Sequence, residues 1–295
     1  MLNYYFYRLG QFIALCLPLR LVYAIAVFLA DVHYFFAFRD RRFVKANLRV
    51  IFPEKSNRQL RKISRMVFRN FAKYLADFFR FEKLDRDYIN KNIKLENLHY
   101  FDQALAKGKG VVVLTAHLGN WELGGVVVAQ LGYPFWVVAL PHKNKSVNDF
   151  FDAQRNGKGV KVIATGKAVR SCISEIKNNH MVALAGDRDF SEKGMRIDFF
   201  GRPAHFPEGP AALSLITGAS IVPGFMLRNE DDSFTLRIEK PVEFKPTGDK
   251  IKDLKDLICL YKNIFEDYIR KYPQQWYVFR KFWADPALPG AGSKD

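Results

Sequence analysis

Apolar and polar residues follow three different patterns along this chain. Residues 11–30 form an apolar run long enough for a helix that crosses a bilayer. After Ser56, a favourable helix N-cap, apolar residues recur at helical spacing as far as Phe78. Farther on, short apolar runs of strand length alternate with amphipathic segments. The patterns predict four parts: an N-terminal membrane-anchoring helix (1–38), basic amphipathic helices (39–94), a mixed domain that would carry any catalysis (95–283) and a disordered tail (284–295).

Two residues inside the apolar run affect its interpretation. Pro18 favours a kink, and Arg20 would place a charge near the centre of a bilayer, where charge is costly. No small-residue cleavage site follows the run, which argues against a secretory signal peptide. We therefore expect residues 11–30 to anchor the protein, either by spanning the membrane or by lying in its interface.

The mixed domain is predicted to be an α/β fold. Strands are expected at 110–115, 135–140, 160–163, 181–185, 220–227 and 234–238. Helices are expected at 120–131, 147–155, 168–177, 210–217 and 251–271. Strands that alternate with helices favour a largely parallel central sheet flanked by helices.

Charge narrows the range of partners. The net charge is +16, and residues 39–92 hold 16 Lys or Arg against 6 Asp or Glu, directly after the apolar run. Basic sequence beside a hydrophobic anchor is typical of the cytoplasmic face of a membrane with anionic lipids. No nucleic-acid-binding motif accompanies it, so we expect membrane lipids as partners and no nucleic acid. The three cysteines lie far apart, which indicates a reducing compartment and no metal site.

The segment TAHLGNWELGG, residues 115–125, carries the clearest candidate chemistry. On a continuous helix, the five-residue step from His117 to Glu122 would advance about 500°, so the two side chains would not share a face. The spacing fits a histidine on a strand-to-helix turn, with its imidazole folded back over the carboxylate. Glu122 would then fix the tautomer of a general base, and the helix N-terminus would offer N–H groups to an anion. A purely structural turn is the alternative.

Motifs along the chain resemble, in order, those of one enzyme family. Residues 117–122 (HLGNWE) have the form His-x4-Asp/Glu, and Arg155 with Gly159 has the form Arg-x3-Gly. The other segments are NLRVIFPEKS (47–56), GDRDF (186–190), IDFFGRPAHFPEGPAAL (197–213) and PQQWYVFRKF (273–282). Together they resemble the bacterial lipid A biosynthesis (lauroyl/myristoyl-type) acyltransferase family, within the lysophospholipid acyltransferase superfamily.

The resemblance implies a membrane-associated O-acyltransferase at the bacterial inner membrane, with its catalytic domain facing the cytoplasm. His117 and Glu122 would be catalytic, and His117 would be the general base. The acyl donor would be a thioester of acyl carrier protein or coenzyme A, and transfer to a hydroxyl of a lipid acceptor would be direct. No cofactor, metal ion or acyl-enzyme is implied, and we expect a monomer.

The same resemblance implies the substrate-binding residues. Arg155 would bind phosphate or the acyl carrier, unless it is only a surface arginine. One aspartate of the Asp-Arg-Asp segment (187–189) would support His117, unless the segment forms only a structural ion pair. The substrate-binding set is completed by Asn120, Asp187, Asp189 and Glu208.

The acceptor stays open between alternatives. A lipid A precursor is the favoured acceptor, but the family usually has Asp-Gln-Asp where this chain has Asp-Arg-Asp. That variant resembles the mycobacterial phosphatidylinositol-mannoside acyltransferases, so a glycolipid of that kind is the alternative, with a lysophospholipid as a further one. A basic membrane-binding scaffold is the non-enzyme alternative.

Apolar residues around the motif predict a narrow groove for the acyl chain beside His117. The candidates are Leu118, Trp121, Val126, Val127, Phe199, Phe200 and Phe206. For Val126 and Val127, core packing is the favoured alternative. His142 or His205, both expected in loops near strand ends, could also line the site.

Overall fold

The central sheet has seven strands, in the order β1-β9-β8-β2-β5-β3-β4, in the computed structural model, which describes residues 2–164, 168–189 and 194–283. The strands are β1 (Ile93–Glu96), β2 (Val111–Thr115), β3 (Phe135–Ala139), β4 (Lys161–Ala164), β5 (Met181–Ala185), β8 (Ser220–Arg228) and β9 (Phe234–Ile238). Among the described strands of this sheet, β8 and β9 form the one antiparallel pair, because a short loop joins them, whereas longer crossovers permit the parallel pairing of the others. The predicted α/β fold with a largely parallel sheet is confirmed.

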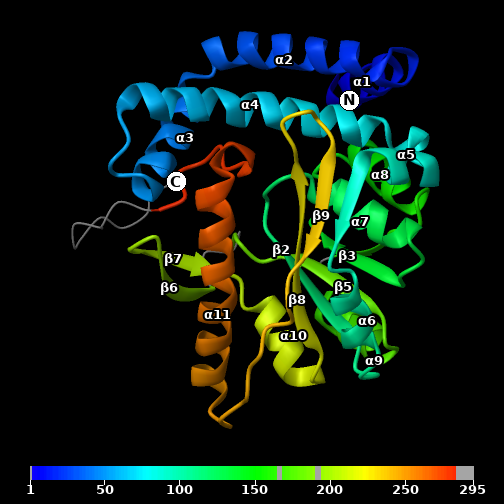
Figure 1. Ribbon diagram of the computed structural model, residues 1–295, viewed down its shortest axis with the longest axis vertical. Helices are drawn as coiled ribbons and strands as arrows, with labels where there is room; N and C mark the ends of the chain where they lie inside the picture. Colours follow the sequence, from blue (N-terminus) through cyan, green and yellow to red (C-terminus); the bar gives the residue numbers. More distant parts are fainter. Residues whose placement is uncertain (1, 165–167, 190–193, 284–295) are drawn as a thin grey trace.

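Helices cover both faces of the sheet, because side chains along each strand alternate between two apolar layers. In β2, Val111 and Val113 face the layer of α6 (His99–Leu105), α7 (Trp121–Gln130) and α8 (Lys145–Asn156). Val112 and Leu114 face the layer of α9 (Ala168–Lys177), α10 (Gly209–Thr217) and α11 (Lys250–Lys271). Figure 1 shows α11 on one side of the sheet and α7 and α8 on the other.

Some elements were not predicted from the sequence. These are α5 (Arg86–Asn92), β1, α6 and the hairpin of β6 (Met195–Phe199) and β7 (Arg202–Phe206). β1 is an edge strand that pairs only with β9, and the hairpin forms a separate two-stranded sheet. Such strands are buried on one face at most, so charged residues interrupt their apolar pattern. His205, expected in a loop, lies in β7 and is exposed. The tail 284–295 lies outside the described residues.

The apolar run at 11–30 forms parts of two helices, α1 (Leu2–Cys16) and α2 (Leu19–Phe36), instead of one. Pro18 separates them, because proline has no N–H to continue the helical ladder. Arg80 donates hydrogen bonds to the backbone carbonyls of Ala14 and Leu17, which the end of α1 leaves without a helical partner. By length and composition, α2 is the described helix that could cross a membrane.

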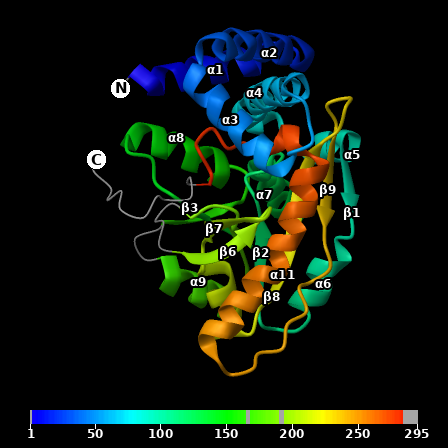
Figure 2. The same ribbon diagram turned by 90° about the vertical axis from the view of Figure 1, so that its left-hand side faces the viewer.

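Two further helices follow, α3 (Phe38–Ile51) and α4 (Asn57–Phe79). The Ser56 hydroxyl caps α4 by accepting the Gln59 N–H, and the Gln59 side-chain oxygen accepts the Ser56 N–H, which completes a capping box. The predicted cap and the predicted amphipathic helix are therefore confirmed. α2 lies alongside α4 at one end of the sheet (Figures 1 and 2).

A buried polar network joins these helices to the sheet. The Asp77 carboxylate of α4 accepts a hydrogen bond from Tyr23 of α2 at 2.5 Å and pairs with Arg228 of β8. Asn120, just before α7, donates to the same carboxylate at 2.8 Å. A buried charge needs partners of this kind. The network therefore fixes α2 against the rest of the protein.

Candidate active site

His117 lies in the turn between β2 and α7, at the carboxyl ends of the parallel strands. Gly119 has φ +67°, and a Cβ there would lie 2.0 Å from the Met226 carbonyl oxygen, so the turn requires glycine. The segment after α11 clamps the turn: the Tyr277 N–H donates to the His117 carbonyl at 3.0 Å, and the Gly119 N–H donates to the Gln275 carbonyl at 2.9 Å. Residues from both ends of the domain therefore position His117.

Asp187 orients the His117 side chain. Its Oδ1 atom lies 2.7 Å from His117 Nδ1 and also accepts the His117 backbone N–H at 3.0 Å. Its Oδ2 atom accepts the indole N–H of Trp276 at 3.0 Å, and the residue is fully buried. Burial alone would raise the pKa of Asp187, but His117, Arg188 and the Trp276 hydrogen bond hold the pKa of this carboxyl well below its usual range. An ionised carboxylate only accepts, so Nδ1 carries the proton and Nε2 is the basic nitrogen.

Glu122 has a different partner from the one predicted. Its carboxylate accepts two hydrogen bonds from Arg155, at 2.9 Å from Nε and 2.6 Å from Nη2. The prediction that Glu122 fixes the His117 tautomer is therefore wrong, and Asp187 has that place instead. Glu122 lies in the first turn of α7, from which it reaches α8, where Arg155 is buried. The alternative of a surface arginine at 155 is wrong as well.

The remaining predicted residues divide between the site and its scaffold. Asn120 is buried, accepts the Leu123 N–H as the cap of α7 and donates to Asp77, so the structure gives it a place in the scaffold, and its role in substrate binding stays a prediction. Asp187, being fully buried, contacts His117 instead of the open cavity. Asp189 lines the cavity, whereas Glu208 is exposed at the start of α10 and does not.

A cavity of about 590 Å³ opens beside His117. Its mouth is polar, with Glu122, Arg155, Arg188 and Asp189 among the lining residues. Its body lies between the sheet and helices α6 and α7, and its lining is apolar: Phe101, Val113, Gly124, Gly125, Val128, Phe135, Met226, Leu236 and Ile238. The volume and the mixed lining suit a ligand with a polar head and an apolar tail.

The apolar cavity was predicted beside His117, but its lining differs from the prediction. Trp121 lines it, whereas Leu118, Val126, Val127, Phe199, Phe200 and Phe206 are buried in the core. Two glycines of α7 keep this part of the cavity open, because they have no side chain. A Cβ on Gly124 would lie 3.2 Å from Met226 Cβ, and one on Gly125 would lie 3.1 Å from Phe135 Cε1.

Two residues of the site, Arg188 and Trp276, were not assigned a place in it from the sequence. Arg188 lines the cavity, its Nε lies 3.6 Å from Asp187 Oδ2, and that Nε has no hydrogen-bond partner among the described residues. Burial lowers the pKa of Arg188 to about 10. Trp276 donates a hydrogen bond to Asp187. Its position in the family-like segment PQQWYVFRKF was the sequence feature that could have indicated a role in the site. His142 was one of two candidates, and it lines the cavity.

Comparisons with known proteins find similarity to acyltransferases. Residues 1–285 match the model of the bacterial lipid A biosynthesis acyltransferase family. A phosphatidylinositol mannoside acyltransferase of Mycolicibacterium smegmatis is 26% identical over 218 residues, which cover 72% of this chain and 70% of that protein. One from Mycobacterium tuberculosis is 31% identical over 160 residues, 52% of this chain and 51% of its own length. A lipid A biosynthesis palmitoleoyltransferase of Escherichia coli K12 is 25% identical over 252 residues, 84% of this chain and 80% of that protein.

Proposed function

The chain belongs to the bacterial lipid A biosynthesis acyltransferase family, and from this premise we propose that it transfers a fatty acyl chain from a thioester to a hydroxyl of a glycolipid acceptor, with His117 as the general base. The observation that carries the proposal is the contact of 2.7 Å between His117 and ionised Asp187, at the mouth of an apolar cavity. A histidine held in this tautomer is suited to accept a proton from an attacking hydroxyl.

The proposed reaction needs no acyl-enzyme. The acceptor oxygen attacks the thioester carbonyl carbon while His117 Nε2 takes the hydroxyl proton. The tetrahedral intermediate then collapses, the carbon–sulfur bond breaks, and the imidazolium returns the proton to the leaving thiolate. The products are an ester and a free thiol. Asp187 stabilises the transient imidazolium, because its negative charge lies beside Nδ1.

Arg188 is the proposed partner of the negative charge that develops on the carbonyl oxygen. Its buried Nε has no described hydrogen-bond partner, and it lines the cavity that His117 lines. A fixed cation in a water-poor site stabilises such a charge strongly. Arg155, the basic residue favoured from the sequence, directs two of its nitrogens to Glu122. We propose that it binds the donor phosphate only with the N–H groups that do not donate to carboxylates.

The apolar body of the cavity is the proposed site of the acyl chain. Its lining between the sheet and α7 is continuous with the polar mouth, so a tail in the body would present its thioester beside His117. Each buried methylene contributes about 0.8 kcal/mol, which makes such a cavity selective for chain length. We propose no cofactor beyond the thioester, and action as a monomer, since the described site is built from one chain.

The proposed location is the cytoplasmic surface of the inner membrane, with α2 in the interface. α2 is apolar, but Tyr23 contacts Asp77 and Asp31 pairs with Arg65 and Arg69 along basic helix α4. A bilayer-spanning α2 in this arrangement would draw α4 and its charges into hydrocarbon, which is costly. An interfacial helix keeps both contacts.

The acceptor is proposed to be a lipid A precursor, with a phosphatidylinositol mannoside as the alternative that the mycobacterial relatives favour. Purified protein in detergent would be given each acceptor with palmitoyl thioesters of acyl carrier protein and of coenzyme A. Mass spectrometry should find one acceptor heavier by one acyl group and an equal amount of free thiol. If neither glycolipid is acylated with either donor, while a lysophospholipid is, the proposed acceptor class is wrong.

A further inference from the structure

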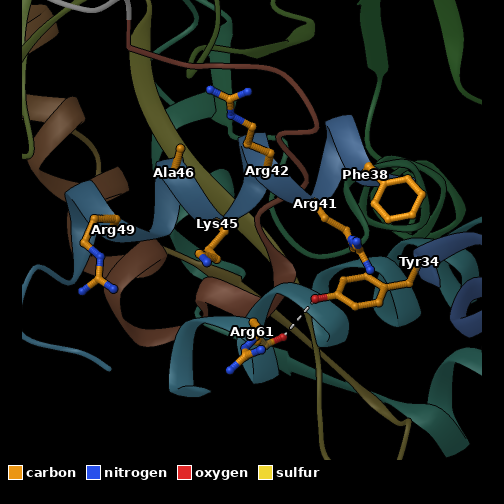
Figure 3. A pocket seen from close by; sticks show the side chains of 8 residues that line it. All are labelled: Tyr34, Phe38, Arg41, Arg42, Lys45, Ala46, Arg49 and Arg61. Atoms are coloured by element: carbon orange, nitrogen blue, oxygen red, sulfur yellow. Dashed lines mark hydrogen bonds between the residues drawn. The ribbon is translucent and has the colours of Figure 1, made fainter. Parts of the chain in front are cut away.

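A second cavity, of about 540 Å³, lies between the end of α2, helix α3 and the start of α4 (Figure 3). We call it the basic cleft. Its lining residues are Tyr34, Phe38, Arg41, Arg42, Lys45, Ala46, Arg49 and Arg61. Every ionisable side chain among them other than Tyr34 is a cation. Figure 3 shows Arg41 and Lys45 on the side of α3 turned toward α4, and Arg42 on the opposite side.

The positive charge of this cleft is not neutralised within the described part of the chain. Arg41, Lys45 and Arg61 form no ion pair with a described carboxylate, and Arg49 is held by neutral oxygens only, including Asn57 Oδ1 at 2.9 Å. One turn farther along α4 the situation is different. There Asp31 pairs with Arg65 at 2.8 Å and with Arg69 at 2.5 Å.

Apolar side chains that face solvent lie directly beside the cleft. The Arg41 guanidinium stacks on the rings of Tyr34 and Phe38, at 5.2 and 4.7 Å from their centroids. Along α2 the exposed apolar side chains continue with Phe28, Leu29, Val32, Phe35 and Phe36. Aromatic residues beside cations are characteristic of the depth at which a protein meets lipid headgroups.

We propose that the basic cleft binds the phosphate of an anionic phospholipid headgroup, separately from the catalytic cavity. The guanidinium groups of Arg41 and Arg61 offer forked donors that match phosphate oxygens, and Lys45 adds a point charge between them. An acidic acyl carrier protein would also be attracted by the charge. The concave shape and the exposed aromatic residues favour a lipid, because these rings gain from an apolar surrounding and the cleft fits one headgroup.

The test is vesicle flotation with the full chain, which requires no catalysis and so stands apart from the proposed reaction. Vesicles are phosphatidylcholine alone, or phosphatidylcholine with about one part in five of phosphatidylglycerol. The variant Arg41→Gln/Lys45→Gln/Arg61→Gln should bind the anionic vesicles roughly 10- to 100-fold more weakly than wild type, with binding to neutral vesicles unchanged. The matched control, Lys245→Gln/Lys250→Gln/Lys255→Gln, removes the same charge from exposed sites around the start of α11 and should bind like wild type.

Equal losses in the two triple variants would overturn the proposal, because attraction would then depend on net charge and not on the cleft. It is also overturned if the cleft variant keeps its anionic-vesicle affinity but loses affinity for acyl carrier protein, measured by titration. Lys45→Glu alone serves if the triple variant fails to fold. It should lower anionic-vesicle binding at least severalfold, and unchanged binding would contradict the site.

Discussion

His117 and Asp187 are 70 residues apart in the sequence, yet His117 Nδ1 and Asp187 Oδ1 are 2.7 Å apart in the fold. β2 and β5 are neighbouring parallel strands, and the two residues follow their carboxyl ends. Parallel pairing therefore brings the base and its orienting carboxylate together at the edge of the sheet where ligands of α/β proteins bind.

The first prediction concerns this pair. His117→Ala should lower acyl transfer about 10²–10⁴-fold with the fold intact, because the general base is lost. Asp187→Asn should also lower the rate constant, because an amide can donate to Nδ1 and leave the proton on Nε2. Product mass spectrometry measures the rate, and circular dichroism checks folding. Wild-type turnover in His117→Ala would rule out the proposed base.

The second prediction is a pH dependence of stability. The pKa of Asp187 is depressed in the folded protein, so its ionised form stabilises the fold fully above the ordinary aspartate pKa of about 3.9. This stabilisation is lost as the pH falls toward the depressed value. The difference in unfolding free energy between wild type and Asp187→Asn should therefore be larger at pH 6 than at pH 3. Urea unfolding in detergent measures it, and an equal difference at both pH values would contradict the assignment.

The third prediction concerns the Glu122–Arg155 ion pair. Glu122→Ala should lower the unfolding free energy by about 3–5 kcal/mol, because the buried Arg155 loses its bidentate carboxylate and keeps only the longer contact of 3.2 Å with the partly exposed Asp152. Glu122→Leu/Arg155→Met should recover most of that loss. Lys252→Ala, which removes an exposed ion pair with Asp256, is the control and should change stability by less than about 1 kcal/mol. If the double variant is as unstable as the single one, the pair is not the cause.

The fourth prediction concerns chain length. Phe135→Leu enlarges the cavity and should raise the relative rate of a donor longer by two carbons roughly tenfold, since each buried methylene contributes about 0.8 kcal/mol. Val128→Phe should favour shorter donors. Phe199→Leu makes the same change as Phe135→Leu in the core outside the cavity, so it should leave the preference unchanged. Competition between donors, read by mass spectrometry, tests this. Identical preferences in all three variants would assign selectivity to the donor carrier.

The fifth prediction concerns the apolar surface of α2. Phe28→Ser/Phe35→Ser/Phe36→Ser should release much of the protein from neutral vesicles, because these exposed rings would otherwise insert into the interface. Deleting residues 1–38 is a poorer experiment, since it would also remove Tyr23 from Asp77 and Arg228. Retention of the triple variant on neutral vesicles in high salt would indicate another hydrophobic anchor.

The sequence by itself determined most of the helices and strands and singled out His117. Apolar periodicity is local, so β5 and α9 were predicted at their observed bounds, and Pro18 was recognised as an interruption of the first apolar run. The strand-to-helix turn at His117 was also predicted, because a strand pattern ends and a cap with a helix pattern begins within a few residues.

Only the tertiary structure decided which carboxylate each charged group meets. Glu122 is near His117 in sequence but is directed toward Arg155, whereas Asp187 reaches His117 because β5 pairs with β2. The cavity lining was decided in the same way, since the body of the cavity lies between layers formed by distant segments. Hydrophobic periodicity shows which face of an element is buried. It does not show which neighbour that face meets, because strand order and helix packing depend on the whole chain.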